Sequence, residues 1–165
     1  MMVPGFCSYF ESCAALGINI TGVPMTPHKN TDGPISAGDW KLDPDVLRKH
    51  LTNDHKMLVL NTPQAPIGKM FTKEELDSIA TVVKEFPNLM VLSDEVYEYI
   101  KFDGNVHHRI ANCDGMFDRT ISLFSAGKTF SCTGWRLGYA IAPPSMIKPM
   151  TDMHCTVNFS TTTPL

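Results

Sequence analysis

A serine, a lysine and an arginine lie close together in one short stretch of the sequence. Ser125, Lys128 and Arg136 stand at offsets of zero, three and eleven, among small residues and glycines, directly after an apolar segment. A lysine amine attacks an aldehyde when it is positioned and shielded from full hydration. A hydroxyl and a guanidinium suit the oxygens of a phosphate. The stretch therefore predicts a phosphate held beside an amine.

Two other interpretations apply to this stretch. A surface loop with a solvated lysine would bind nothing. A nucleotide-binding P-loop would use Gly127, Lys128 and Thr129, but that motif requires a glycine five residues before its Gly-Lys pair, where Ser122 stands. The P-loop is thus excluded, and the surface loop remains the alternative.

Asp94 and Tyr97 form a second polar group, just after the apolar run from Leu89 to Leu92. A carboxylate at the end of a buried strand is costly unless a cation pairs with it. A protonated pyridine nitrogen is such a cation, and the carboxylate would keep it protonated. Taken alone, an aspartate at this place is also typical of a cap or a turn.

Together these residues resemble the Schiff-base lysine motif of class I, fold-type I pyridoxal phosphate (PLP) aminotransferases. Within that class the sequence is similar to the kynurenine aminotransferase and cysteine-S-conjugate β-lyase group. The resemblance implies PLP as the cofactor and a Schiff base at Lys128. It implies that Ser125 and Arg136 bind the phosphate, that Asp94 pairs with the pyridine nitrogen, and that Tyr97 hydrogen-bonds the phenolic oxygen of the cofactor.

Phe6 and the segment from Asn61 to Lys69 extend the resemblance. Phe6 matches an aromatic residue that stacks on the cofactor ring, for which a core phenylalanine is the alternative. Asn61 matches an asparagine near the substrate carboxylate. Ala65, however, stands where the family has a second asparagine that hydrogen-bonds the phenolic oxygen. Since such a bond contributes roughly 1.5 to 3 kcal/mol, we expect the Schiff base to keep its proton to higher pH here.

The reaction that the resemblance implies is transamination of a kynurenine-like or glutamine-like amino acid to its 2-oxo acid. Lys128, displaced from the cofactor by the substrate amine, would act as the general base at the α carbon. A cysteine conjugate, which has a leaving group on its β carbon, would undergo β-elimination. The implied partners are amino acids and 2-oxo acids, and a homodimer in the full-length form.

The elements that position these residues follow from caps and periodicity. Helices are predicted up to Leu16, from the Asp43-Pro44 cap to Leu51, after the Thr72/Glu75 capping box, and from Ser145. A long connection is expected over 25–40. Apolar runs predict strands at 18–23, 56–60, 89–92, 120–124 and 137–141. This alternation predicts an α/β fold, which the resemblance makes a three-layer sandwich with a mostly parallel sheet.

The match covers almost the whole chain, but the chain is well under half of a family member. We therefore expect residues 1–165 to be a fragment, part of the cofactor-binding large domain without the small domain, with sheet edges and one face uncovered. The arginine that binds the substrate carboxylate in the family has no counterpart. A truncated, non-catalytic remnant that binds PLP weakly or serves as an interaction domain is the alternative function.

Composition supports one globular domain. The chain has 165 residues, of which 43% are hydrophobic, and a net charge of -3. This charge offers no basic field for nucleic acid, and no apolar run approaches the roughly 20 residues that cross a bilayer. Five cysteines without a CxxC motif or a leader predict reduced thiols and a cytoplasmic location, or a mitochondrial one if a longer N-terminus exists. No metal is expected at the adjacent His107 and His108.

Overall fold

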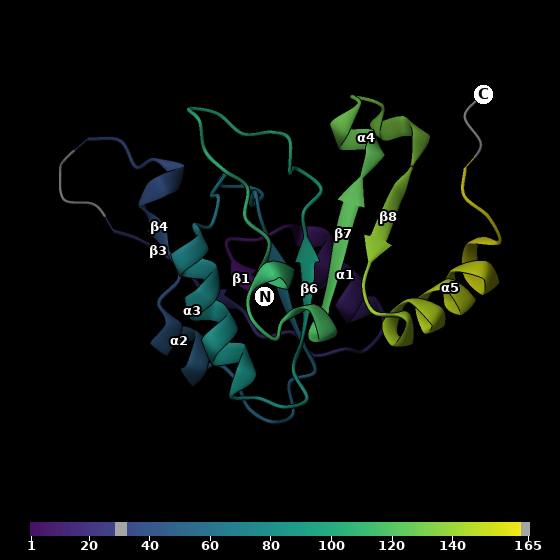
Figure 1. The fold of residues 1–165 in the computed structure, drawn as a ribbon, viewed down its shortest axis with the longest axis horizontal. Coiled ribbons are helices and arrows are strands. Elements are labelled where there is room, and N and C mark those ends of the chain that lie inside the picture. The colour runs from purple at the N-terminus through teal and green to yellow at the C-terminus, as the bar shows by residue number, and fades with distance from the viewer. Residues whose placement is uncertain (29–32, 163–165) are drawn as a thin grey trace.

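A four-stranded sheet with the order β5-β6-β7-β8 forms the centre of the protein (Figure 1). The computed structural model describes residues 1–28 and 33–162. Three strands are parallel, and β8 is antiparallel to β7. Their bounds are β5 (Met57–Asn61), β6 (Met90–Asp94), β7 (Thr120–Ser125) and β8 (Gly138–Ile141). Asn61 pairs with Asp94 and Ser125 with Gly138. The predicted site residues therefore meet at the carboxyl ends of the parallel strands.

The strands form where continuous apolar runs were predicted, within one or two residues. Leu58, Leu60 and Val91 are almost completely buried because they lie on the face of the sheet that packs into the core, whereas Val59 and Leu92 on the other face are half-buried. The antiparallel direction of β8 was not predicted. It follows from the connection after β7, which contains only α4 (Ala126–Thr129) and a single 3-10 turn, η4 (Thr133–Trp135). Such a link contains no helix long enough to carry the chain back along the sheet for another parallel strand.

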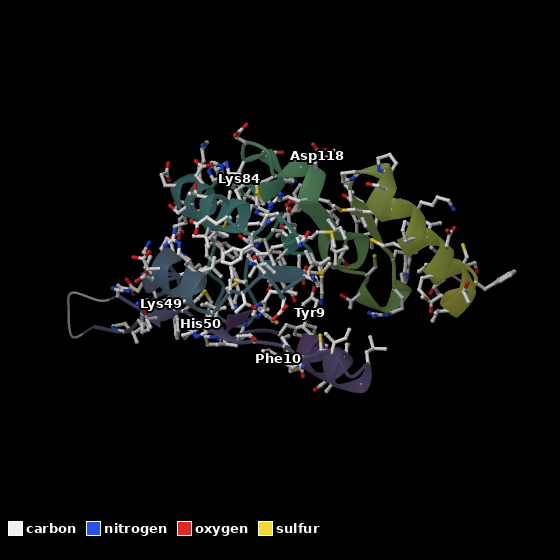
Figure 2. The ribbon with its side chains drawn as sticks, turned by 90° about the horizontal axis from the view of Figure 1, so that it is seen from below. Tyr9, Phe10, Lys49, His50, Lys84 and Asp118 are labelled. Atoms are coloured by element: carbon white, nitrogen blue, oxygen red, sulfur yellow. The ribbon has the colours of Figure 1, made fainter. Side chains whose placement is uncertain are left out.

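Helices lie on both sides of the sheet (Figure 2). α3 (Lys73–Lys84) begins at the predicted capping box and buries its apolar face against the sheet, which forms the main core. α2 (Pro44–Lys49) packs beside it. Figure 2 shows α1 (Cys7–Ala15), with Tyr9 and Phe10, on the opposite side of the molecule from Lys84 at the end of α3. The three layers agree with the predicted sandwich.

Local signals explain the helix ends. The Asp43 carboxylate accepts a hydrogen bond of 2.8 Å from the Asp45 N–H, and Pro44 occupies the first turn of α2. This helix ends two residues before the predicted Leu51. Gly17, directly after the C-cap of α1, has a φ of +67°, the left-handed conformation that glycine adopts without strain.

Outside the main sheet, the sequence was less informative. The strand predicted over 18–23 is wrong for most of its length, because only β2 (Val23–Pro24) forms, paired with β1 (Met2–Val3). The predicted connection over 25–40 contains a short antiparallel pair, β3 (Thr26–Pro27) and β4 (Trp40–Lys41), and the 3-10 turn η1 (Ala37–Asp39). Residues 29–32 of that connection lie outside the described residues.

α5 (Pro144–Asn158) follows β8 at the opposite end of the molecule from α2 and α3 (Figure 1). None of its residues is buried, and Met153 and Val157 on it are exposed. Tyr139 and Ile141 on β8 are also half exposed, which agrees with the expected uncovered surface. Among the described helices, none is long and apolar enough to cross a membrane.

Candidate active site

A cavity of about 400 Å³ lies at the carboxyl ends of β5, β6 and β7. Every residue that the sequence predicted for the site lines this cavity. These residues are Phe6, Asn61, Asp94, Tyr97, Ser125, Lys128 and Arg136. The structure therefore brings together side chains that are up to 130 positions apart (136 minus 6) in the sequence. The individual roles assigned to them stay predictions.

Asp94, at the end of β6, is 8% exposed and faces this cavity. Its Oδ2 accepts a hydrogen bond of 2.8 Å from the Tyr9 hydroxyl, and its Oδ1 one of 3.3 Å from the Val96 N–H. Within residues 1–28 and 33–162, no cation forms an ion pair with it. Burial raises the pKa of the Asp94 carboxyl, and the bond from Tyr9 only partly offsets this. A cation in the cavity would restore the charged form.

Tyr9 is a site residue that sequence reasoning missed. Burial and the nearby Asp94 carboxylate raise the pKa of Tyr9 well above its usual range, so that its hydroxyl remains a donor. The available signal was its spacing, because Tyr9 follows Phe6 by three residues and such residues share one side of a helix. The ring centroids of Phe6 and Tyr9 are 6.3 Å apart, edge to face. Nothing local indicated a partner 85 positions away.

Lys128 lies on the short α4, directly beyond β7. Its backbone N–H donates a 3.2 Å hydrogen bond to the Ser125 hydroxyl, which caps the helix. Its Nζ lies 5.5 Å from the centroid of the Tyr97 ring, so the amine and the phenol face each other. The Lys128 amine therefore lines the cavity beside an aromatic ring, whereas a solvated surface loop would leave it away from both.

Arg136 contributes the guanidinium of the cavity. Its Nη1 donates to the Thr133 carbonyl at 3.4 Å, and no carboxylate pairs with it in the part of the chain that the structure describes. Its backbone is left-handed, with a φ of +55°, a conformation that costs a non-glycine residue about 1 kcal/mol. At Gly138 nearby, a Cβ would lie 2.7 Å from the Phe124 carbonyl oxygen, so only glycine fits.

Asn61 and Ala65 share one side of the cavity. The Asn61 Nδ2 donates to the Asp94 carbonyl at 2.9 Å, and its Oδ1 accepts from the Ala65 N–H at 2.7 Å. Asn61 therefore ties β5 to β6 and fixes the following loop, a structural task that the sequence did not indicate. Ala65 presents no side-chain donor to the cavity.

Phe6 is 48% exposed, so it is not a core residue and the alternative reading of it is wrong. The cavity combines an aromatic side chain, an amine, a buried carboxyl that pairs with no cation of the described ranges, and two groups suited to a phosphate. This donor set fits PLP, which carries an aldehyde, a basic ring nitrogen and a phosphate.

Comparison with known proteins gives consistent matches. The family model of class I and II aminotransferases matches residues 1–165. The kynurenine–oxoglutarate transaminase of Dictyostelium discoideum is 46% identical over 82% of this chain and 31% of its own length. Kynurenine–oxoglutarate transaminase 3 of Bos taurus is 41% identical over 100% of this chain and 36% of its own. The chain thus spans about a third of these relatives.

A solved structure shows the same fold. The aromatic aminotransferase from Pyrococcus horikoshii superposes with a TM-score of 0.85 at 36% identity. The superposition covers 98% of this chain and 41% of that protein.

Proposed function

The chain belongs to the class I and II aminotransferases, a PLP-dependent family, and we propose that it carries the cofactor site of an enzyme that transaminates kynurenine-like or glutamine-like amino acids. The observation that supports this most is the cavity, because the Lys128 amine and the buried Asp94, which pairs with no cation among the described residues, line the same space. The names of the relatives, kynurenine–oxoglutarate transaminases, support kynurenine as the amino donor.

The ring side of the cofactor would be held by three residues. Asp94 carries the negative charge that pairs with a protonated ring nitrogen, and Tyr9 holds that carboxylate in place through its hydroxyl. Phe6 offers its ring for stacking. Bound PLP supplies an aldehyde that condenses with amines and a ring that accepts the electron pair released at the substrate's α carbon.

The phosphate and the reacting amine lie on the segment after β7. Ser125 and Arg136 provide a hydroxyl and a guanidinium for the phosphate oxygens. Lys128 would provide the amine that binds the cofactor aldehyde, and its Nζ would carry a proton from the substrate's α carbon to the aldehyde carbon of the cofactor. Tyr97 donates its hydroxyl hydrogen to the phenolic oxygen. Asn61 lies beside the place proposed for the substrate carboxylate.

The further proposals concern the whole protein. Residues 1–165 form part of the large, cofactor-binding domain, and the full-length protein acts as a cytoplasmic homodimer on amino acids and 2-oxo acids. A substrate with a leaving group on its β carbon, such as a cysteine conjugate, undergoes β-elimination at the same site. These points rest on the family resemblance and on the relatives, about a third of whose length this chain matches.

A spectroscopic titration tests the proposal. PLP added to the chain should produce a Schiff-base absorbance band that shifts when kynurenine is added, and borohydride should fix the cofactor on Lys128. Lys128→Ala should lose the band. A borohydride-stable adduct at another lysine would refute the role of Lys128. A band that does not respond to kynurenine, in this chain and in a longer transcript product, would favour the non-catalytic remnant.

A further inference from the structure

A cluster of buried charges lies next to the cavity but does not line it. Glu95 is completely buried, and its carboxylate has three partners. Oε1 accepts a hydrogen bond of 3.0 Å from the Ser93 hydroxyl, Oε2 lies 2.8 Å from His107 Nε2 in a second hydrogen bond, and Oε2 also forms an ion pair with Arg109 Nε at 3.0 Å. A carboxylate this deeply buried is costly unless it is fully paired. The number of its partners explains how the fold tolerates it.

Arg109 joins this carboxylate to a second one. Its Nη2 donates to the carboxylate of Glu98, which is 7% exposed. The Glu98 N–H also donates to the Glu95 carbonyl at 3.0 Å. One planar guanidinium therefore holds both ends of the turn over residues 95–98. Tyr97, which lines the cavity, lies inside this turn.

The same cluster connects the turn to β7. The Glu95 N–H donates to the Leu123 carbonyl at 2.9 Å. The Arg109 guanidinium lies 5.6 Å from the centroid of the Phe124 ring, which lines the cavity and stacks on Tyr139 at 4.9 Å. Since α4 begins at the end of β7, these contacts fix the distance between the Tyr97 turn and the helix that carries Lys128.

His107 Nδ1 is buried without a hydrogen-bond partner, and no other buried side-chain atom within the described ranges is in that state. Most buried polar atoms in proteins have a partner, so His107 is the exception in this cluster, and its Nε2 bond to Glu95 is the contact that ties it to the turn.

We propose that Arg109 is a positioning residue, which through Glu95 and Glu98 holds the Tyr97 phenol opposite the Lys128 amine. This inference rests on the proposed function, because the placement matters only if Tyr97 and Lys128 act on the same cofactor. Arg109 itself touches neither the cavity nor the reacting atoms.

Two substitutions test the inference in the 165-residue chain. Arg109→Met removes the guanidinium and keeps much of its apolar volume, whereas Arg109→Lys keeps the charge but loses the planar fork. We expect Arg109→Met to weaken PLP binding about tenfold and to raise the apparent pKa of the Schiff-base band by about one unit, the tenfold change that one ordinary hydrogen bond produces. Arg109→Lys should give an intermediate shift. The readouts are absorbance titrations with PLP and with pH.

Arg48→Met is the matched control. Arg48 also bridges two acids, Asp45 and Glu85, but it lies on α2, away from the cavity. The Arg48→Met substitution should leave the PLP dissociation constant and the pKa of the Schiff-base band unchanged. A Tyr97→Phe background provides the decisive comparison, because the pKa shift caused by Arg109→Lys should disappear when the phenol hydroxyl is absent.

Four results would overturn the inference. The first is a folded Arg109→Met chain with an unchanged PLP dissociation constant and an unchanged band pKa. The second, which applies if circular dichroism shows that Arg109→Met does not fold, is an unchanged band pKa in Arg109→Lys. The third is a shift that persists in full in the Tyr97→Phe background, which would mean that Arg109 does not act through Tyr97. If the unsubstituted chain forms no Schiff base, the proposed function fails as well, so the two failures are distinguishable.

Discussion

At the scale of single residues, the hydroxyl of Tyr9 stabilises the charged form of Asp94, the acid that lines the cavity. Removing it in Tyr9→Phe leaves the Asp94 carboxyl only the bond from the Val96 N–H. Because burial already raises the pKa of Asp94, the loss of a donor raises it further. We expect PLP affinity to fall about tenfold, the effect of one hydrogen bond to a charged group.

The pH dependence follows from the direction of that shift. Asp94 is charged only above its raised pKa, so the loss of PLP affinity in Tyr9→Phe should be larger at about pH 6 than at about pH 8. PLP titrations at both pH values measure it. Tyr139→Phe, which removes a hydroxyl outside the cavity, should leave PLP affinity unchanged at both pH values. Equal affinities of Tyr9→Phe and the unsubstituted chain at both pH values would contradict the role of Tyr9.

Ala65 is a position where a substitution should improve the site rather than weaken it. It lines the cavity without a side-chain donor, and the Asn61 oxygen bonds only its backbone N–H. Ala65→Asn should therefore add a donor for the phenolic oxygen without removing an existing contact. We expect higher turnover in any active form and a lower pKa of the Schiff-base band, recorded by absorbance. If neither rate nor cofactor affinity improves, the assignment of this position is wrong.

The residue types at the site could be read from the sequence, whereas their partners could not. Lys128, Asp94 and Ser125 stand in recognisable patterns, because each follows a strand within a short motif. Tyr9 and Arg109 carry no such pattern, since their partners are brought near only by the packing of α1 and of the loop before β7. Side-chain contacts between distant segments leave no local periodicity.

At the scale of elements, α3 depends on an ion pair at its first turn. Lys69 is 1% exposed, and its Nζ lies 3.0 Å from both carboxylate oxygens of Glu75, the capping-box residue of α3. Burial lowers the pKa of Lys69 despite this pairing. Burial opposes ionisation of Glu75 too, but hydrogen bonds from the Thr72 N–H, Lys69 and Lys41 outweigh it and lower the pKa of Glu75.

Breaking this pair from its two sides should have unequal effects. Glu75→Ala leaves a buried ammonium without its acceptor and removes half of the capping box, so we expect a loss of about 3 kcal/mol in the free energy of unfolding. Lys69→Met leaves Glu75 bonded to Thr72 and Lys41, and should cost about 1 kcal/mol. Urea denaturation at neutral pH measures both. Equal losses would contradict the argument.

Acid provides a second test of the pair. The lowered pKa of Glu75 stabilises the fold above the pKa that the residue has when unfolded, and this contribution is lost as the pH falls through the folded value. Glu75→Ala should therefore lose less stability than the unsubstituted chain between neutral pH and about pH 4. Lys73→Met, which removes an exposed pair with Asp77, serves as the control and should leave the neutral-pH stability unchanged within error.

The elements themselves were largely predictable, because caps and apolar runs act locally. Thr72 with Glu75 fixed the start of α3, and the runs before Asn61, Asp94 and Ser125 fixed the parallel strands. The direction of β8 depends instead on the link after β7, which contains no crossover helix. The two-residue strands near the N-terminus depend on pairing alone, so no periodicity could indicate them.

At the scale of the whole molecule, α5 is the least supported element. It has no buried residue, and its apolar Met153 and Val157 face outward. Since protection from hydrogen exchange follows burial and tertiary packing, we expect its amides to exchange far faster than those of β6. Hydrogen–deuterium exchange followed by mass spectrometry measures the difference. Protection of α5 equal to that of β6 would mean that another surface covers the helix in solution.

The arrangement of the cavity has a mechanical consequence. Phe6, Asp94 and Tyr97 come from the segments up to β6 and its following turn, whereas Lys128 and Arg136 come from the segment after β7. A small molecule held by both groups would act as a reversible cross-link over the boundary between these two strands. Mechanical separation of β6 from β7 would first have to release the ligand. Ligand occupancy would therefore raise the force needed to separate these two strands.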